Sequence, residues 1–326
     1  MARIELIIAI LAVSFGVTHV FTYFLIPRLR RFNITGKDVN KPDTPVTPEM
    51  GGIAIVAGFT AGMLLAVFMN SFFNFDFNLI HILAALIAIH SVAFIGIIDD
   101  LLDLPQWLKA GLPLFAAIPL VSVKAAGSTV LVIPFIGLVD FGLLYILLLI
   151  PIGIAVASNL TNMLAGFNGM ESGMGIVIFA TVVLLALNRG DTEPLIISLA
   201  MVGSLLAFFI YNRYPARVFP GDVGNLTIGA ALASAVIIGN IEAAGALLLF
   251  PYVVDFFIKM KNKFPSKEWW GVYKNGKLYA VGNKARGFAQ LVMKSSNGIS
   301  EKNLTLFFVA LEMVVGSVVL LLFLKF

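Results

Sequence analysis

Long apolar segments alternate with short polar ones along the whole chain. The segments are close to the roughly 20 residues with which an α-helix crosses a bilayer. In one of them no charged residue occurs from Leu79 until Asp99. The pattern predicts an all-α polytopic membrane protein with about ten transmembrane helices, folded as a single domain over 1–326. The expected spans are 4–26, 51–69, 79–98, 110–123, 141–157, 173–187, 195–211, 223–238, 242–258 and 304–324.

The composition agrees with many spans and excludes some chemistry. Hydrophobic residues make up 60% of the 326 positions and charged residues only 12%, whereas soluble domains carry about 25% charged residues. The chain has no cysteine, which excludes disulfides, thiol catalysis and zinc–thiolate sites. The three histidines lie in or beside apolar segments, and we expect them to form hydrogen bonds between helices.

The basic residues lie almost entirely in alternate loops. With ten spans, the odd-numbered loops share one side, and they hold all of the 22 lysines and arginines except Arg3, Lys124, Arg189 and Lys325. The positive-inside rule makes this side cytoplasmic and places both termini outside. We number the cytoplasmic loops 1 (about 27–50), 3 (99–109), 5 (158–172), 7 (212–222) and 9 (259–303).

On the outer side, residues 124–140 contain a Gly-Ser pair and several β-branched residues. This composition predicts a short hairpin between two spans.

The polar residues of the cytoplasmic loops indicate chemistry. Asp99 and Asp100 end an apolar segment, where two adjacent carboxylates require a cation such as Lys109 or Mg²⁺. Asparagines and glycines fill loop 5, and Asp222 lies in GDVG of loop 7. Oxygen ligands without histidine or cysteine suit Mg²⁺ or Mn²⁺, and a glycine-rich segment before a helix near Gly173 suits an anion. Together they predict diphosphate chemistry at a cytoplasmic membrane face.

Four other acidic residues have simpler interpretations. Glu171 is expected to cap the helix that begins beside it, and Asp103 to lie in a solvated loop. Asp255 and Glu312 are more deeply embedded in apolar segments, and we expect them to pair with other helices or with water.

The order of motifs resembles a known family. The chain carries DD at 99–100, N-x-x-N-x-x-AG-x-NG-x-E from Asn159, and F-x-GD from Phe219. This order is similar to the polyprenyl-phosphate N-acetylhexosamine-1-phosphate transferases, most of all to their dolichyl-phosphate branch of eukaryotes and archaea. An archaeal source is expected because the chain is short and loop 9 has no histidine.

The resemblance implies an activity. It is the transfer of GlcNAc-1-phosphate from UDP-GlcNAc to a membrane polyprenyl (dolichyl) phosphate, which gives GlcNAc-diphosphate-lipid and UMP, the first step of lipid-linked oligosaccharide assembly for protein N-glycosylation. The implied cofactor is Mg²⁺, with Mn²⁺ as a substitute. The implied partners are both substrates and the bilayer of the cell membrane, without nucleic acid, and a homodimer is left open.

The resemblance also implies a role for individual residues. Asn162 and Asp222 match the metal ligands, and Lys109 matches a phosphate-contacting lysine. Asp99 and Asp100 match an acidic pair that organises the metal site and the attacking phosphate, and Asn159 supports the diphosphate. The positions implied to contact the nucleotide sugar are Glu49, Gly166, Asn168, Phe219 and Arg286.

Alternatives remain open at this point. Loop 9 reads the sugar in this family, and the bacterial branches carry a histidine-rich motif there, but no histidine follows His90. This argues against the enzymes that use undecaprenyl phosphate for cell-wall polysaccharides, while another UDP-sugar stays open as donor. A more distant alternative is an ion-coupled transporter. Its site would lie near the bilayer midplane, whereas these acids lie at span ends.

Overall fold

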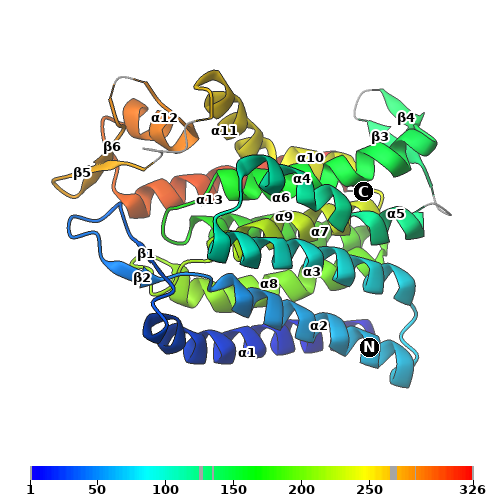
Figure 1. Cartoon of the computed structure of the whole chain (residues 1–326). Helices are drawn as coiled ribbons and strands as arrows, with labels where there is room; N and C mark the ends of the chain where they lie inside the picture. The colour runs from blue at the N-terminus through cyan, green and yellow to red at the C-terminus, as the bar shows by residue number, and fades with distance from the viewer. Residues whose placement is uncertain (1, 125–127, 134–135, 265–269, 283, 325–326) are drawn as a thin grey trace.

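The computed structural model describes residues 2–124, 128–133, 136–264, 270–282 and 284–324 (Figure 1). Within them nine helices are long and apolar enough to cross a membrane, and a bent pair brings the number to ten. The expected all-α membrane architecture is therefore confirmed. The spans are α1 (Ala2–Arg31), α2 (Gly52–Phe73), α3 (Leu79–Leu102), α4 with α5 (Gln106–Ala116, Ile118–Lys124), a π-helical turn η1 with α6 (Tyr145–Leu149, Ile150–Met163), α7 (Met170–Arg189), α8 (Thr192–Asn212), α9 (Gly221–Ile238), α10 with α11 (Glu242–Leu248, Phe250–Lys261) and α13 (Glu301–Phe323).

One of the spans that the pattern predicts is sharply bent. We expected a single helix over 242–258, but α10 and α11 meet at an angle of 59°. Pro251 lies in the first turn of α11. Proline lacks the N–H that would continue the helical ladder, and its ring displaces the carbonyl four residues earlier. The break directs α11 away from the axis of α10.

Short elements occupy both ends of the bundle. The hairpin of β3 and β4 confirms the one expected within 124–140, although 125–127 and 134–135 lie outside the described residues. Two more hairpins belong to loops 1 and 9, and α12 (Phe288–Ser295) also lies in loop 9. The strand pairs are β1 (Thr35–Lys37) with β2 (Val46–Pro48), β3 (Val130–Ile133) with β4 (Gly137–Asp140), and β5 (Val272–Lys274) with β6 (Lys277–Tyr279).

The two ends of the bundle differ in what they carry. The start of α1, the end of α13 and the β3–β4 hairpin lie at one end, whereas β1–β2, β5–β6 and α12 lie at the other (Figure 1). The loops that hold the motifs therefore converge at the end opposite the two termini.

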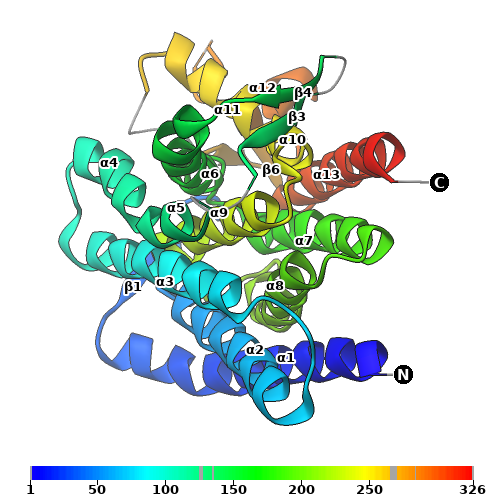
Figure 2. The same cartoon turned by 90° about the vertical axis from the view of Figure 1, so that its right-hand side faces the viewer.

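Helix α9 is the central element. Figure 2 shows α9 surrounded by α3, α6, α7 and α8, and all four pack on it. Every residue of α9 except Asp222 is buried. A helix that is apolar on all sides fits a position inside the bundle. Asp222, in the first turn, is consequently the most exposed residue of this helix.

Close packing fixes the end of loop 1 against α9. A Cβ on Gly52 would lie 2.3 Å from the Cα of Gly224, so only glycine permits the approach of α2 to α9. Small residues at such crossings are typical of membrane helices. The amides of Gly51 and Phe219 then bond to carbonyls of the facing segment, Gly51 to Phe219 and Phe219 to Pro48, each at 2.8 Å.

Two of the three histidines link helices as expected, and for His81 the expectation stays a prediction. His90 on α3 lies 2.8 Å from the hydroxyl of Thr60 on α2, and His19 on α1 lies 3.2 Å from the hydroxyl of Tyr211 on α8.

Candidate active site

The predicted catalytic residues stand on helix ends rather than in loops. Asp99 and Asp100 belong to the last turn of α3, Lys109 to the first turn of α4, and Asp222 to the first turn of α9. The helices extend further than their apolar segments, because a charged residue at a helix end still completes the backbone hydrogen bonds of its turn. Asn162 likewise lies in the last turn of α6. The rigid ends of four helices thus hold the site.

Lys109 is the cation that the acidic pair requires. Its ammonium ion-pairs with Asp99 and donates to Asp222 Oδ2 at 2.7 Å. Asp99 is only 4% exposed, and its other oxygen accepts the N–H of Leu104 at 3.0 Å. A buried carboxylate without such partners would strongly destabilise the fold. The lysine therefore bridges α3 and α9 through two carboxylates.

Asp100 has a different partner from the one expected. Its two carboxylate oxygens accept the backbone N–H groups of Asp222, at 2.8 Å, and Val223, at 3.0 Å. These groups belong to the positive end of α9, which attracts an anion. Lys109 is therefore the cation of Asp99, whereas the described partners of Asp100 are two N–H groups at a helix terminus. A metal that shares its charge with Asp100 stays a prediction. The contact of Asp100 with the attacking phosphate also stays a prediction.

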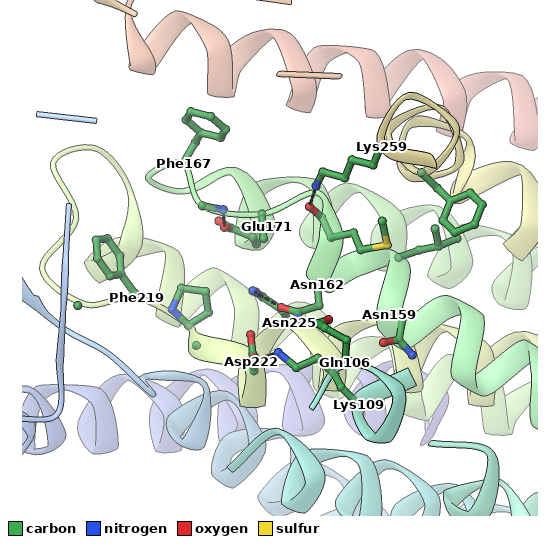
Figure 3. Close-up of a pocket in the computed structure, with 18 of the residues that line it drawn as sticks. Gln106, Lys109, Asn159, Asn162, Phe167, Glu171, Phe219, Asp222, Asn225 and Lys259 are labelled. Carbon is green, nitrogen blue, oxygen red and sulfur yellow. Dashed lines mark hydrogen bonds and ion pairs between the residues drawn. The ribbon is translucent and has the colours of Figure 1, made fainter. Parts of the chain in front are cut away.

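A cavity of about 1070 Å³ opens beside these residues (Figure 3). Four further predicted positions line it together with Lys109, Asn162 and Asp222, namely Glu49, Asn159, Gly166 and Phe219. Asp99 and Asp100 lie outside the lining and contact it through Lys109 and the start of α9. The structure brings residues from loops 1, 3, 5 and 7 to one cavity. Glu49 and Asn225, both in its lining, are 176 positions apart in the sequence.

Oxygen atoms gather where α6 meets α9. Asn225 donates through Nδ2 to Asn162 Oδ1 at 3.1 Å, and both side chains line the cavity with Asp222. The Oδ1 of Asn225 is buried and has no hydrogen-bond partner among the described residues. Carboxylate and amide oxygens are the ligands that Mg²⁺ takes, usually one or two from the protein with substrate phosphates beside them. The residues present therefore fit a magnesium ion.

Asn225 is a residue that the sequence reasoning missed. It follows Asp222 by three positions on the same helix, and residues three apart lie on one helix face. That spacing is the signal that could have identified it.

Glu49 and Phe219 form another part of the wall. Burial raises the pKa of Glu49, and the negative charge of Asp222 raises that pKa further.

Gly166 is held by two polar contacts: its N–H donates to the Glu171 carboxylate, and its carbonyl accepts from Asn40 Nδ2 at 3.0 Å. Glu171 was expected to cap α7, and the structure shows it holding the glycine-rich segment just before that helix.

Asn168 does not line the cavity. Its side-chain oxygen accepts from Lys41 Nζ at 3.1 Å and from the amide of Ala216 at 2.8 Å, and its Nδ2 donates to Asp38 at 3.1 Å. Lys41 also ion-pairs with Asp38 and with Glu301 at the start of α13. We call these four residues, Lys41, Asp38, Asn168 and Glu301, the Lys41 cluster. A uridine contact for Asn168 stays a prediction.

Arg286 also lies outside the cavity lining, and its backbone N–H donates to Gln290 Oε1 at 2.9 Å. The embedded acid Asp255 pairs with another helix, as expected, because its Oδ1 accepts the N–H of Phe288 at the start of α12 at 2.7 Å. It also has an ion pair within its own helix, 2.8 Å from Lys259 Nζ. Glu312 on α13 is fully buried and has no hydrogen-bond partner among the described residues, so the expected protein partner is not found there. Asp103 is exposed, as expected.

Known proteins are similar to this chain over most of its length. The sequence profile of glycosyl transferase family 4 matches residues 82–240. A Saccharolobus solfataricus protein, described as a putative UDP-N-acetylglucosamine–dolichyl-phosphate N-acetylglucosaminephosphotransferase, is 36% identical over 90% of this chain and 89% of its own. The Dictyostelium discoideum protein described by the same activity is 28% identical over 77% and 71%. A phospho-N-acetylmuramoyl-pentapeptide-transferase of Halalkalibacterium halodurans is 28% identical over 78% and 84%.

Proposed function

The chain belongs to glycosyl transferase family 4, and from this premise we propose that it transfers GlcNAc-1-phosphate from UDP-GlcNAc to dolichyl phosphate. The products are GlcNAc-diphosphate-dolichol and UMP, the starting point of lipid-linked oligosaccharides for protein N-glycosylation. The observation that carries the proposal is the 36% identity, over 90% of this chain, to a relative whose description contains both substrates.

The lining of the cavity supports two substrates of different polarity. Asp222, Asn162 and Lys109 supply charged and polar groups, while Val253, Phe256 and Phe257 of α11 supply an apolar wall. A water-soluble nucleotide sugar and a lipid with a phosphate head both require such a mixed site. The mixture favours a reaction at the membrane surface.

Asp222 and Asn162 would hold the Mg²⁺, with the Asn225 oxygen beside them. When bound, the metal supplies positive charge to the diphosphate of the donor. Mn²⁺ prefers the same oxygen ligands and would substitute.

The acceptor phosphate attacks the β-phosphorus of UDP-GlcNAc, and the bond to UMP breaks. A phosphate monoester has a second pKa near 6, so the attacking oxygen is already mostly ionised at pH 7 and needs little help from a base. The main task is to hold two anions together. Lys109 serves this task, because Asp99 and Asp222 fix its ammonium at the cavity. Asp99 and Asp100 act as positioning residues.

The test is UMP release by the purified protein with dolichyl phosphate and a panel of UDP-sugars. A donor that lacks the N-acetyl group leaves polar groups of the pocket unpaired, and each unpaired group costs about 1–3 kcal/mol of binding free energy. We therefore expect kcat/KM for UDP-GlcNAc to exceed that for UDP-glucose at least about tenfold, and UDP-MurNAc-pentapeptide not to react. Equal rates with UDP-glucose, or faster turnover with the muramoyl donor or undecaprenyl phosphate, would identify another branch of the family.

A further inference from the structure

A second lysine, Lys259, faces the cavity from the end of α11. It lies across Asn162 from Lys109 (Figure 3), and its side chain is 15% exposed. In the sequence Lys259 is one of many basic residues of loop 9, which as a group indicate only the side of the membrane on which this loop lies. Asp255 and Lys259 are four residues apart on one helix, and this spacing places the two side chains on the same helix face.

The ammonium of Lys259 is held but not saturated by its protein partners. It lies 2.8 Å from Asp255 Oδ2 and donates to the backbone carbonyl of Met163, in the last turn of α6. An ammonium has three donors, so these two contacts leave one N–H for a group in the cavity. One carboxylate balances Lys259, whereas two carboxylates balance Lys109.

The neighbours of Lys259 indicate which phosphate it would meet. Val253, Phe256 and Phe257 line the cavity within two turns before Lys259 on the same helix. An amphiphile with its chain against these side chains would bring its charged head to Lys259. Phe219, on the wall implied to contact the nucleotide, lies on the other side of Asn162 in Figure 3. The arrangement favours the lipid substrate over the nucleotide.

We propose that Lys259 binds the phosphate of the polyprenyl acceptor, and that Asp255 positions it. This inference rests on the proposed function, since it assigns a residue to one of the two substrates. The contact adds a cation on the side of the cavity opposite Lys109, so that the two anions are held from both sides.

Asp255 has a second contact that links the acceptor side to loop 9. Its Oδ1 accepts the N–H of Phe288 at 2.7 Å, at the start of α12, and Asp255 itself is 1% exposed. A Cβ on Gly287 would lie 2.8 Å from the same oxygen, so glycine permits this approach. Asp255→Asn separates the two contacts, because asparagine keeps an oxygen for Phe288 and loses the charge that holds Lys259.

The experiment measures UMP release by the full-length protein while dolichyl phosphate and UDP-GlcNAc are varied separately. For Lys259→Ala we expect the KM for dolichyl phosphate to rise at least about tenfold, because the variant loses one charge-assisted hydrogen bond to this substrate. The KM for UDP-GlcNAc should change less than about twofold. Lys259→Arg should restore part of the loss. Lys259→Met keeps the length of the side chain and decides the matter if the alanine variant does not fold.

Lys261→Ala is the matched control, because Lys261 is exposed on the same helix and lies outside the cavity lining. We expect both KM values to be unchanged in it. Asp255→Asn should raise the KM for dolichyl phosphate in the wild-type background and have no further effect on it in Lys259→Ala.

The outcomes separate the two proposals. Wild-type protein that is inactive with UDP-GlcNAc and dolichyl phosphate overturns the proposed function and this inference with it. Active wild-type protein with an unchanged acceptor KM in Lys259→Met overturns the inference alone. A rise in the UDP-GlcNAc KM instead would assign Lys259 to the donor and also overturn it.

Discussion

Asp222 combines three contacts that define the site. Its carboxylate accepts from Lys109 at 2.7 Å, its backbone N–H is held by Asp100 at 2.8 Å, and it faces the cavity beside Asn162. The contact with Lys109 sets the charge at the cavity wall, and the contact with Asp100 fixes the start of α9. The position beside Asn162 places a neutral amide oxygen near the charged carboxylate. A change at this residue therefore affects ligand binding and electrostatics together.

At Asp222 we predict a metal requirement. Asp222→Asn keeps the size of the side chain but removes the charge, and it should lower kcat about 100-fold or more, as expected for one lost electrostatic contact in an active site. Asn162→Ala should have a similar effect. EDTA should abolish turnover and added Mg²⁺ should restore it, measured as UMP release. Full activity in EDTA, or normal rates in both variants, would contradict the prediction.

At Asp100 we predict a loss of stability. Asp100→Ala leaves the first N–H groups of α9 without their acceptor, which should cost about 2 kcal/mol and lower the Tm of the purified protein by several degrees. Asp103→Asn is the control, since Asp103 is an exposed neighbour at the end of the same helix and asparagine tolerates its left-handed backbone, with φ 49°. A Tm equally unchanged in both variants would exclude the capping role.

At the scale of elements, bent helices and loop contacts build the cavity. The 59° break between α10 and α11 lets α11 supply the apolar wall and Lys259. The Lys41 cluster joins loop 1, loop 5 and the start of α13, and its ion pair between Lys41 and Glu301 spans 260 positions of the sequence. These contacts fix loop 1, the loop that contains Glu49, against loop 5 and α13.

For the Lys41 cluster we predict a stability effect that depends on charge. Lys41→Ala leaves the carboxylates of Asp38 and Glu301 buried without their cation, which should destabilise the protein by about 3–5 kcal/mol. Asp43→Ala, at an exposed position of the same loop, should leave the Tm unchanged. Thermal unfolding of the two variants tests this difference, and a similar Tm for both would show that the cluster contributes little.

At the scale of the whole molecule, the site and the termini lie at opposite ends of the bundle (Figure 1). By the positive-inside rule, the distribution of basic residues predicts that the site end is cytoplasmic. Such an orientation would give the active site access to a cytosolic nucleotide sugar and to lipid in the same leaflet.

Cysteine labelling tests this orientation, because the chain has no cysteine of its own. Leu138→Cys, at a position 75% exposed in the β3–β4 hairpin, should react with a membrane-impermeant maleimide in intact cells. Asp103→Cys should react only after the membrane is opened. Labelling of Asp103→Cys but not of Leu138→Cys in intact cells would show that the site end faces the outside.

The sequence by itself determined the class of protein, the approximate spans and the residue types of the site. Hydropathy is a local property of about 20 residues, so 79–98 could be assigned to a helix without any knowledge of its neighbours. The motifs around Asn162 and Asp222 likewise contain several of the polar residues that line the cavity, and each motif could be found because it is contiguous in the chain.

The tertiary structure alone decided which of these residues meet. Lys109 and Asp222 are 113 positions apart, and their contact depends on how α4 and α9 converge. The packing of α3 on α9 placed Asp100 at a helix terminus, and the packing of α6 on α9 paired Asn225 with Asn162. The bend between α10 and α11 brought Lys259 from a basic loop to the cavity. A charge in the sequence reveals its sign but not its partner, because electrostatic and hydrogen-bond energies depend on distances that only the packed helices set.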